Sequence, residues 1–256
     1  LSGQFPRLIY ASVTGFGQTG PYAHRAGYDF LIQGMSGIMD LTGEADGAPQ
    51  KPGVAFADIF TGLYGVIGIQ AALADRARTG LGQHIDLSLL DTMTAMMANQ
   101  ASSYLASGQC PTRMGNAHPS IVPYQVFPVQ DGHIIIACGN TGQFQRLCRA
   151  IDRNDLATHP DYATNPLRLT HREALVSALT ATFATWPRDQ LLAACEANDV
   201  PAAPINTLAQ ALEDPHILAR GLRIAPEGVD ALRTPLVFSR STLVHDRTAP
   251  KLGQDD

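Results

Sequence analysis

One carboxylate stands alone in an apolar part of the sequence. Asp58 is flanked by alanine, phenylalanine and isoleucine residues between Gly53 and Gly62, at the start of a long predicted helix. Because a buried charge without a partner is costly, this carboxylate must be paired, cap the helix or take part in chemistry. Capping and catalysis both remain open, and a single carboxylate at a helix N-terminus can do both.

A glycine-rich segment is the second candidate. The run Gly15-Phe16-Gly17-Gln18-Thr19-Gly20 follows a predicted strand and has the spacing of a dinucleotide-binding loop. In that fingerprint the glycines open a helix whose N-terminus binds the pyrophosphate. Here Pro21 and Gly27 fall where the helix would run. We therefore reject NAD binding, but we expect the backbone of this loop to approach another group closely.

The spacing of the histidines and serines argues against two kinds of catalytic site. None of the eight histidines pairs with another at a metal-ligand spacing, so we expect no metal site. His118 lies in the loop Gly115-Asn116-Ala117-His118-Pro119, at a predicted domain boundary, where ligands often bind. A surface histidine is the alternative. The sequence has no Gly-x-Ser-x-Gly elbow, which argues against a serine hydrolase, although a carboxylate could still act on a thioester.

Composition excludes several classes of protein. The 256 residues are 45% hydrophobic and 16% charged, which is typical of a globular chain, and the net charge of -5 argues against nucleic acid as a partner. The four cysteines lack metal-ligand spacing, so we expect reduced thiols in a cytoplasmic protein. The most apolar stretch, Leu63 to Leu73, is shorter than the roughly 20 residues of a membrane span, so we expect no membrane segment.

The elements that must position these residues follow from hydrophobic periodicity. Residues 8–14 predict a strand that is buried on both faces, and residues 58–79 predict a helix that ends at Gly80. Residues 83–89 predict a second strand, and residues 91–106 predict a helix that ends at Gly108. This alternation of strand and helix favours an α/β fold.

The second half of the sequence predicts a smaller α/β region. After a boundary within residues 108–119, two strands flank an Asp-Gly turn, which predicts a hairpin. Three helices and a short helical tail segment follow. The predicted ranges are strands 124–129 and 133–137, helices 142–151, 172–184, 188–198 and 208–213, and tail strands 221–224 and 234–239.

Several ordered motifs together resemble the class III CoA-transferases, which include formyl-CoA transferase and the succinyl-CoA:dicarboxylate CoA-transferases. The resemblance covers essentially the whole chain. The motifs are Ile9-Tyr10-Ala11-Ser12-Val13-Thr14-Gly15-Phe16-Gly17, Gly20-Pro21-Tyr22, Arg25-Ala26-Gly27-Tyr28-Asp29, Ala57-Asp58, Thr61-Gly62, Thr79-Gly80-Leu81-Gly82-Gln83, Gly115-Asn116-Ala117-His118-Pro119, Val200-Pro201-Ala202-Ala203-Pro204, Asp214-Pro215-His216 and Leu252-Gly253-Gln254.

The resemblance implies a partial Rossmann-like large domain plus a smaller α/β domain, in a family of interlocked homodimers. Residues 1–110 would belong to the large domain, residues 111–205 would form the small domain, and residues 206–256 would return to the large domain. Relative to the family, the sequence lacks an N-terminal region. We therefore expect the chain alone to bind CoA weakly and not to be a self-sufficient catalyst.

The resemblance also implies a mechanism. The carboxylate of Asp58 would attack an acyl-CoA thioester, forming an aspartyl anhydride and then an aspartyl-CoA thioester, before CoA passes to a small carboxylic acid. Coenzyme A would be a substrate, with no permanently bound cofactor. The residues implied for the acyl and acceptor site are Tyr28, Leu89, Gly115, Asn116 and His118, and those implied for CoA binding are Gly15, Phe16, Gly17 and Arg25.

Two other classes of function remain. The racemase of this family resembles the chain at the catalytic aspartate but carries a histidine base where this sequence has Tyr28. Because the pKa of tyrosine is near 10, it is a poor general base at neutral pH, whereas its hydroxyl can orient a carboxylate. A non-catalytic fragment or binding module is the other alternative, and it is favoured by the missing N-terminal region.

Overall fold

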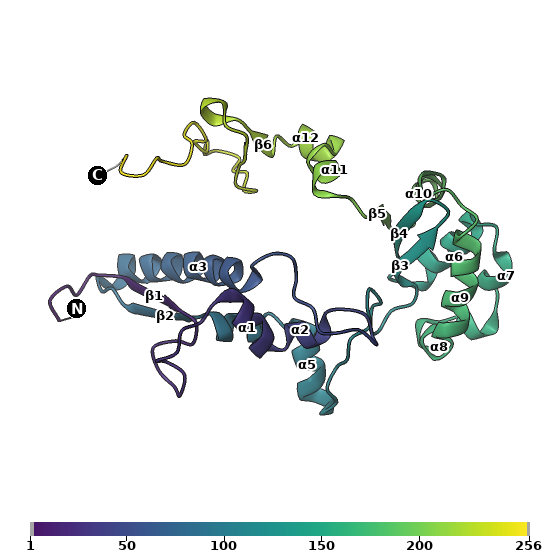
Figure 1. Ribbon diagram of the computed structural model, residues 1–256, viewed down its shortest axis with the longest axis horizontal. Coiled ribbons are helices and arrows are strands. Elements are labelled where there is room, and N and C mark those ends of the chain that lie inside the picture. The colour runs from purple at the N-terminus through teal and green to yellow at the C-terminus, as the bar shows by residue number, and fades with distance from the viewer. Residues whose placement is uncertain (1–2, 255–256) are drawn as a thin grey trace. The chain divides into compact units, whose positions relative to one another are not determined.

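The computed structural model describes residues 3–254 (Figure 1). They divide into two compact units, one that ends at Ile121 and one that begins at Val122. Both units combine helices with strands, so the chain has the α/β fold that the sequence predicts. The assignment of residues 206–256 to a large domain stays a prediction.

The first unit is built on two parallel strands. They pair from Tyr10 opposite His84 to Thr14 opposite Ser88, and three helices lie between them in the sequence. Parallel strands need such a crossover connection because consecutive ends lie at opposite edges of the sheet. The elements are β1 Tyr10–Thr14, α1 Asp29–Ser36, α2 Ile38–Leu41, α3 Phe56–Thr79, β2 His84–Ser88, α4 Leu89–Ala95 and α5 Ala98–Ser107.

The prediction that the first strand is buried on both faces is wrong for this chain. Tyr10 is 49% exposed and Val13 is 56% exposed. Within the described residues, β1 pairs with β2 and with no other strand, so the sheet is two strands wide. A sheet this narrow cannot enclose either of its strands.

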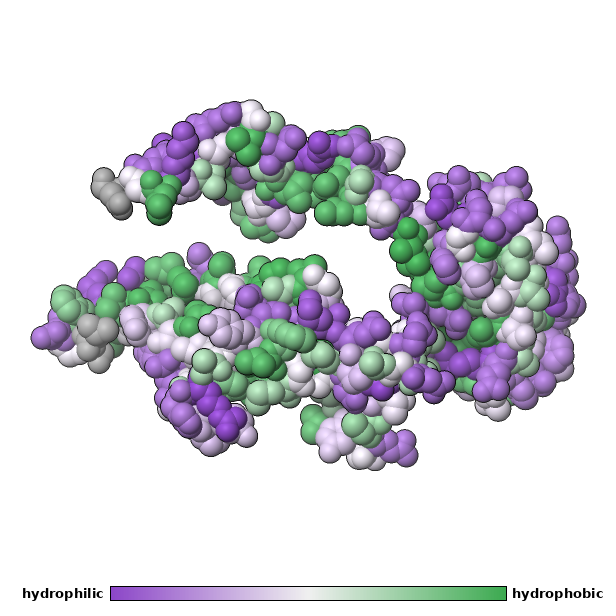
Figure 2. All heavy atoms as spheres, in the orientation of Figure 1, coloured by the Kyte–Doolittle hydropathy of each residue, from purple (hydrophilic) through white to green (hydrophobic). Residues whose placement is uncertain are grey.

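Helix α3 is the longest element, and it ends as predicted at Gly80, which adopts the left-handed conformation with φ 78°. Its glycines let it approach the sheet: Cβ atoms built at Gly65 and Gly68 would each lie 3.4 Å from side chains of β2, Leu87 and Ile85. Its other face is apolar and exposed (Figure 2), and only 22% of its most apolar window is buried. By length and composition alone α3 could cross a membrane, whereas the apolar stretch Leu63 to Leu73 predicts no membrane segment.

The single helix predicted over residues 91–106 is wrong, since the structure has two helices, α4 and α5. The N–H of Met97 donates to the carbonyl of Thr94, a tighter three-residue bond that ends α4. Ala98 then has φ 41°, in the left-handed region, so one continuous helix cannot pass through it.

The second unit contains the predicted hairpin, in which β3 and β4 pair antiparallel from Tyr124 opposite Ala137 to Val129 opposite Gly132. The three helices predicted within residues 142–198 are confirmed. The elements are β3 Tyr124–Val129, β4 Gly132–Ala137, α6 Thr141–Ala150, α7 Asn154–Ala157, the 3-10 helix η1 Pro160–Tyr162, α8 Asn165–Thr170, α9 Arg172–Phe183, α10 Arg188–Ala197, β5 Ala202–Pro204, α11 Leu208–Leu212, α12 Pro215–Ala219, β6 Arg223–Ile224, the 3-10 helix η2 Pro226–Gly228 and β7 Ala231–Leu232.

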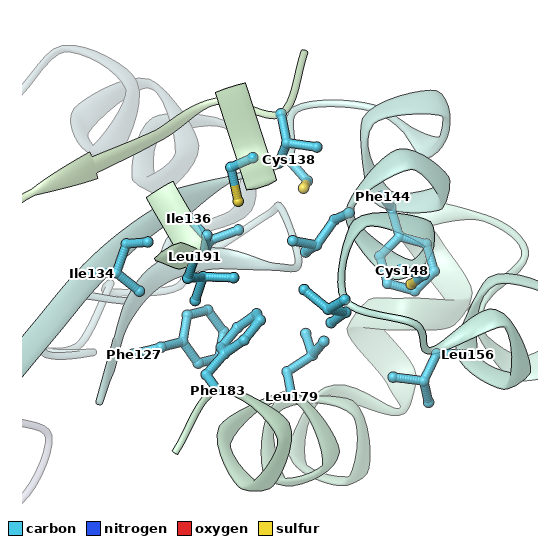
Figure 3. Close-up of a cluster of buried hydrophobic side chains, with 14 of the residues drawn as sticks. Phe127, Ile134, Ile136, Cys138, Phe144, Cys148, Leu156, Leu179, Phe183 and Leu191 are labelled. Carbon is cyan, nitrogen blue, oxygen red and sulfur yellow. The ribbon is translucent and has the colours of Figure 1, made fainter. Parts of the chain in front are cut away.

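A well-packed core fills this unit between the hairpin and α6, α9 and α10 (Figure 3). Phe127 and Phe183 meet edge to face with ring centroids 5.0 Å apart. One cation is also fully buried: Arg168 donates from Nε to the carbonyl of Val122 at 2.7 Å and from Nη1 to the carbonyl of Tyr162 at 3.0 Å. Those bonds offset part of the cost of burying its charge.

The tail differs from the prediction in one strand. Residues 221–224 contribute β6, but no strand forms over residues 234–239, and β6 pairs with β7 instead. Arg233 explains the difference, because its guanidinium donates to the carbonyls of Thr234 and Leu236. Pro235 also lacks the N–H that a sheet ladder requires.

We predict that a single thiol reacts in the native protein. Burial raises the pKa of Cys138 and of Cys148 to about 12, and that of Cys195 to about 11, whereas Cys110 is exposed. Since the thiolate is the reactive form, an aromatic disulfide reagent at pH 8 should modify Cys110 alone, and all four thiols after denaturation. Cys110→Ser should abolish the native reaction, and rapid modification of a second thiol would contradict the buried assignment.

Candidate active site

Asp58 is the third residue of α3, and its side chain is exposed. In the part of the chain that the structure describes, its carboxylate makes no hydrogen bond and no ion pair. The residue that precedes the helix as its N-cap is Ala55, which has no side-chain acceptor. Asp58 therefore does not cap its own helix, and the capping interpretation is wrong.

The cap of α3 comes from a different helix. Asp29, the first residue of α1, accepts a hydrogen bond at Oδ1 from the N–H of Ala57 at 2.9 Å. Its Oδ2 accepts from Nε2 of Gln33 at 2.7 Å. Tyr28 immediately precedes Asp29, as the N-cap of α1, and is 73% exposed. The beginnings of α1 and α3, with Tyr28 and Asp58, are thus joined through one carboxylate.

The glycine loop packs against the same region by backbone contact. A Cβ atom at Gly15 would lie 2.6 Å from Cα of Gly27, so the two glycines leave no room for side chains. The carbonyl of Gly15 accepts from the N–H of Leu90 at 3.1 Å, which ties the loop to α4. Gly17 has φ 82°, in the region that favours glycine. The expected close backbone approach is confirmed, and no helix begins between Gly3 and Tyr28.

A small apolar cluster holds these pieces together. Ile32, Ala57, Leu89 and Met93 are buried, and Phe16 packs against them. The cluster joins the glycine loop to α1, α3 and α4. Two residues implied by the family resemblance, Phe16 and Leu89, therefore lie in the cluster that contains the neighbour of Asp58.

Arg25 lies beside the glycine loop. Its guanidinium carbon is 3.9 Å from the ring centroid of Tyr22, and that ring meets Phe16 edge to face at 5.6 Å. The exposed side chain of Arg25 is thus held near the loop by a cation–π contact, which leaves its charge available to an anion.

The loop that contains His118 is held by contacts with Gly43 and Glu44. The N–H of Gly115 donates to the carbonyl of Gly43 at 3.0 Å, and a Cβ atom at Gly115 would lie 2.8 Å from the carboxylate of Glu44. Nδ1 of His118 accepts from the N–H of Ser120 at 3.0 Å, and Asn116 is exposed. The loop borders a pocket of about 390 Å³ with part of α5. Its approach to Asp58 stays a prediction.

Asp29 and Gln33 have a role in the structure that the sequence did not indicate. Their spacing of four residues at a helix start could have indicated a side-chain pair on one helix face. The bond from Asp29 to Ala57 joins residues 28 positions apart, and no local pattern encodes it.

Comparisons with known proteins define the class. The chain belongs to CoA-transferase family III, whose model matches residues 1–256. It is 51% identical to "Succinate--glutarate CoA-transferase" of Agrobacterium fabrum over 97% of this chain and 64% of that protein, and 39% identical to the Mus musculus "Succinyl-CoA:glutarate CoA-transferase" over 97% and 58%. The chain thus spans about three fifths of the length of these relatives.

A solved structure supports the same assignment. A CaiB/BaiF family protein from Brucella suis is 57% identical to this chain, with a TM-score of 0.87. The match covers 99% of this chain and 67% of that one. The α/β fold described above is therefore the fold of this family.

We predict that Gly27 cannot accept a side chain. In Gly27→Ala the new Cβ would lie 2.6 Å from backbone of Gly15, so the loop must shift, and the free energy of unfolding should fall by about 1–3 kcal/mol. Gly62→Ala is the matched control, because apart from its chain neighbours and the backbone of its own helix no atom lies within 4 Å of its Cβ position, and alanine favours the helix. Equal changes in chemical denaturation for both variants would contradict the close contact.

Proposed function

We propose that the protein is a CoA-transferase that moves CoA from an acyl-CoA thioester to a free carboxylic acid, with Asp58 as the covalent nucleophile. The observation that carries the proposal is the state of Asp58: an exposed carboxylate, without a partner among the described residues, in the first turn of a long helix of a family III chain. A nucleophile must be accessible and not already engaged.

The proposed reaction is a sequence of four acyl exchanges on Asp58. Its carboxylate attacks the thioester carbonyl, which forms an acyl-aspartyl anhydride and expels the CoA thiolate. The thiolate attacks the aspartyl carbonyl, which forms an aspartyl-CoA thioester and releases the first carboxylate. The incoming carboxylate then attacks this thioester, which forms a second acyl-aspartyl anhydride and expels the thiolate again. The thiolate finally attacks the acyl carbonyl of that anhydride, which yields the new acyl-CoA and releases the carboxylate of Asp58.

The helix start suits this chemistry. Each exchange passes through a tetrahedral oxyanion, and the partial positive charge at a helix N-terminus favours negative charge nearby. Asp58 lies in that first turn. The N–H groups of Phe56, Ala57 and Ile59 already donate to Val54, Asp29 and Ala55, so the helix dipole is the part of this turn that would favour the oxyanion.

Asp29 is the carboxylate most easily confused with the nucleophile. Both of its oxygens accept hydrogen bonds, from Ala57 and from Gln33. A carboxylate held in this way is less nucleophilic and less free to move than one without partners. The contrast supports Asp58 in the covalent role.

We assign the acceptor side to Tyr28, Leu89 and the loop of Gly115, Asn116 and His118, and the CoA side to Gly15, Phe16, Gly17 and Arg25. The exposed hydroxyl of Tyr28 can orient a carboxylate, and the cation of Arg25 suits the phosphates of CoA. The names of the relatives support succinyl-CoA as donor and a dicarboxylic acid as acceptor. We further propose a cytoplasmic homodimer without a permanently bound cofactor.

We predict that Asp58→Asn abolishes both CoA transfer and the covalent intermediate in the full-length protein. The amide has the size of the carboxylate but cannot attack the thioester, so turnover should fall by at least about 1,000-fold. The measurements are CoA exchange and the mass of the trapped acyl-enzyme. Asp29→Asn is the matched control and should still form the adduct. Turnover near that of the wild type in Asp58→Asn would rule out the nucleophile.

We predict that Tyr28→Phe weakens binding of the carboxylic acid acceptor more than binding of the acyl-CoA. Loss of one hydroxyl that binds a charged group corresponds to about 1.5–3 kcal/mol, or roughly 10- to 150-fold in the acceptor KM. Steady-state kinetics with each substrate varied separately provide the test. Equal changes for both substrates, or none, would mean that Tyr28 only packs against its neighbours.

A further inference from the structure

We infer that Asp29 and Gln33 are positioning residues that fix the first turn of α3, and through it the carboxylate of Asp58. The inference rests on the proposed function for its consequence, but its structural basis is independent. That basis is a set of hydrogen bonds from two polar side chains of α1 to each other and to the residues at the beginning of α3.

The first turn of a helix has N–H groups that no carbonyl of that helix can accept, and a side chain at the N-cap usually satisfies one of them. In α3 the N-cap is Ala55, which cannot do so. Asp29 replaces that cap from outside the helix, with Oδ1 at 2.9 Å from the N atom of Ala57. The acceptor of this turn therefore belongs to α1, and any displacement of α1 must move the residue next to Asp58.

Gln33 holds the acceptor itself in place. Its side chain is fully buried, and Nε2 donates to Oδ2 of Asp29 at 2.7 Å and to the carbonyl of Val54 at 3.4 Å. One amide thus contacts both the capping carboxylate and the segment that enters α3. Its Oε1 has no partner among the described residues, so Gln33 acts here as a donor.

The N–H, the carbonyl and the methyl group of Ala57 consequently all have partners. Its N–H donates to Asp29, its carbonyl accepts from Oγ1 of Thr61 at 2.7 Å, and its methyl group lies in the buried cluster with Ile32. The next residue is Asp58, whose carboxylate is exposed. The backbone of the nucleophile is therefore held rigidly, and its side chain retains only its own torsions.

The test compares Asp29→Ala, Asp29→Asn and Gln33→Leu with the wild type in the full-length protein. Asp91→Ala is the matched control, because Asp91 is an exposed acid in the first turn of α4 whose carboxylate accepts no hydrogen bond among the described residues. Trapping of the acyl-enzyme counts competent sites, so that turnover can be expressed per site. Hydrogen exchange of the peptide that covers residues 54–60 reports the helix start without reference to activity.

Asp29→Ala should lower turnover per competent site by about 10- to 100-fold, since small displacements of a reacting group have effects of that size. The acyl-CoA KM should remain within about twofold, because uniform binding is untouched. Exchange over residues 54–60 should become faster. Asp29→Asn retains an acceptor for Ala57 and should keep most of the rate, and Gln33→Leu should change rate and exchange in the same direction as Asp29→Ala, by less.

Two results would overturn the inference. One is unchanged exchange over residues 54–60 in Asp29→Ala. The other is a loss of competent sites with normal turnover in those that remain, which would indicate a purely structural role. Should Asp29→Ala not fold, Gln33→Leu carries the same measurements, with Asp29→Asn as the variant that retains the acceptor. A wild type that neither exchanges CoA nor forms an adduct would refute the proposed function instead, while hydrogen exchange would still decide the role of Asp29.

Discussion

The parallel pairing of β1 with β2 is the constraint on which the first unit depends. Because the strands run in the same direction, Thr14 and Ser88 end at the same edge of the sheet. Helix α3 returns the chain to the opposite edge, where Arg76 donates to the carbonyl of Arg7 at 3.1 Å. Its first turn, with Asp58, therefore lies toward the edge where both strands end. Ligands of open α/β sheets bind at that edge.

Local patterns predicted the elements better than the junctions between them. The ends of α3 and the antiparallel hairpin follow from periodicity and from glycines, which are properties of consecutive residues. The break between α4 and α5 depends on the conformation of Ala98, which the helical periodicity of residues 91–106 does not reveal. The predicted strand at residues 234–239 failed for a related reason, because Arg233 takes carbonyls that the ladder would need.

In the candidate site, too, the sequence predicted individual residues but not the contacts that join them. Asp58 stood out because its neighbours are apolar, and family resemblance named Tyr28 with it. The link between them was not visible, because the bond from Asp29 to Ala57 exists only after α1 and α3 have packed. The buried cluster of Ile32, Ala57 and Met93 produces that packing. Sequence thus indicates the candidate nucleophile sooner than the residues that position it.

Two aspartates of the same intrinsic chemistry consequently have different roles. Asp29 accepts two hydrogen bonds and is partly buried, so its carboxylate belongs to the framework. Asp58 lies in the first turn of its helix without capping it, and Asp29 satisfies the N–H of Ala57. A carboxylate that had to cap its own helix would lose a hydrogen bond whenever it reacted. Supplying the cap from α1 separates the stability of the helix from any chemistry at its first turn, so that the proposed acylation of Asp58 would leave the helix start intact.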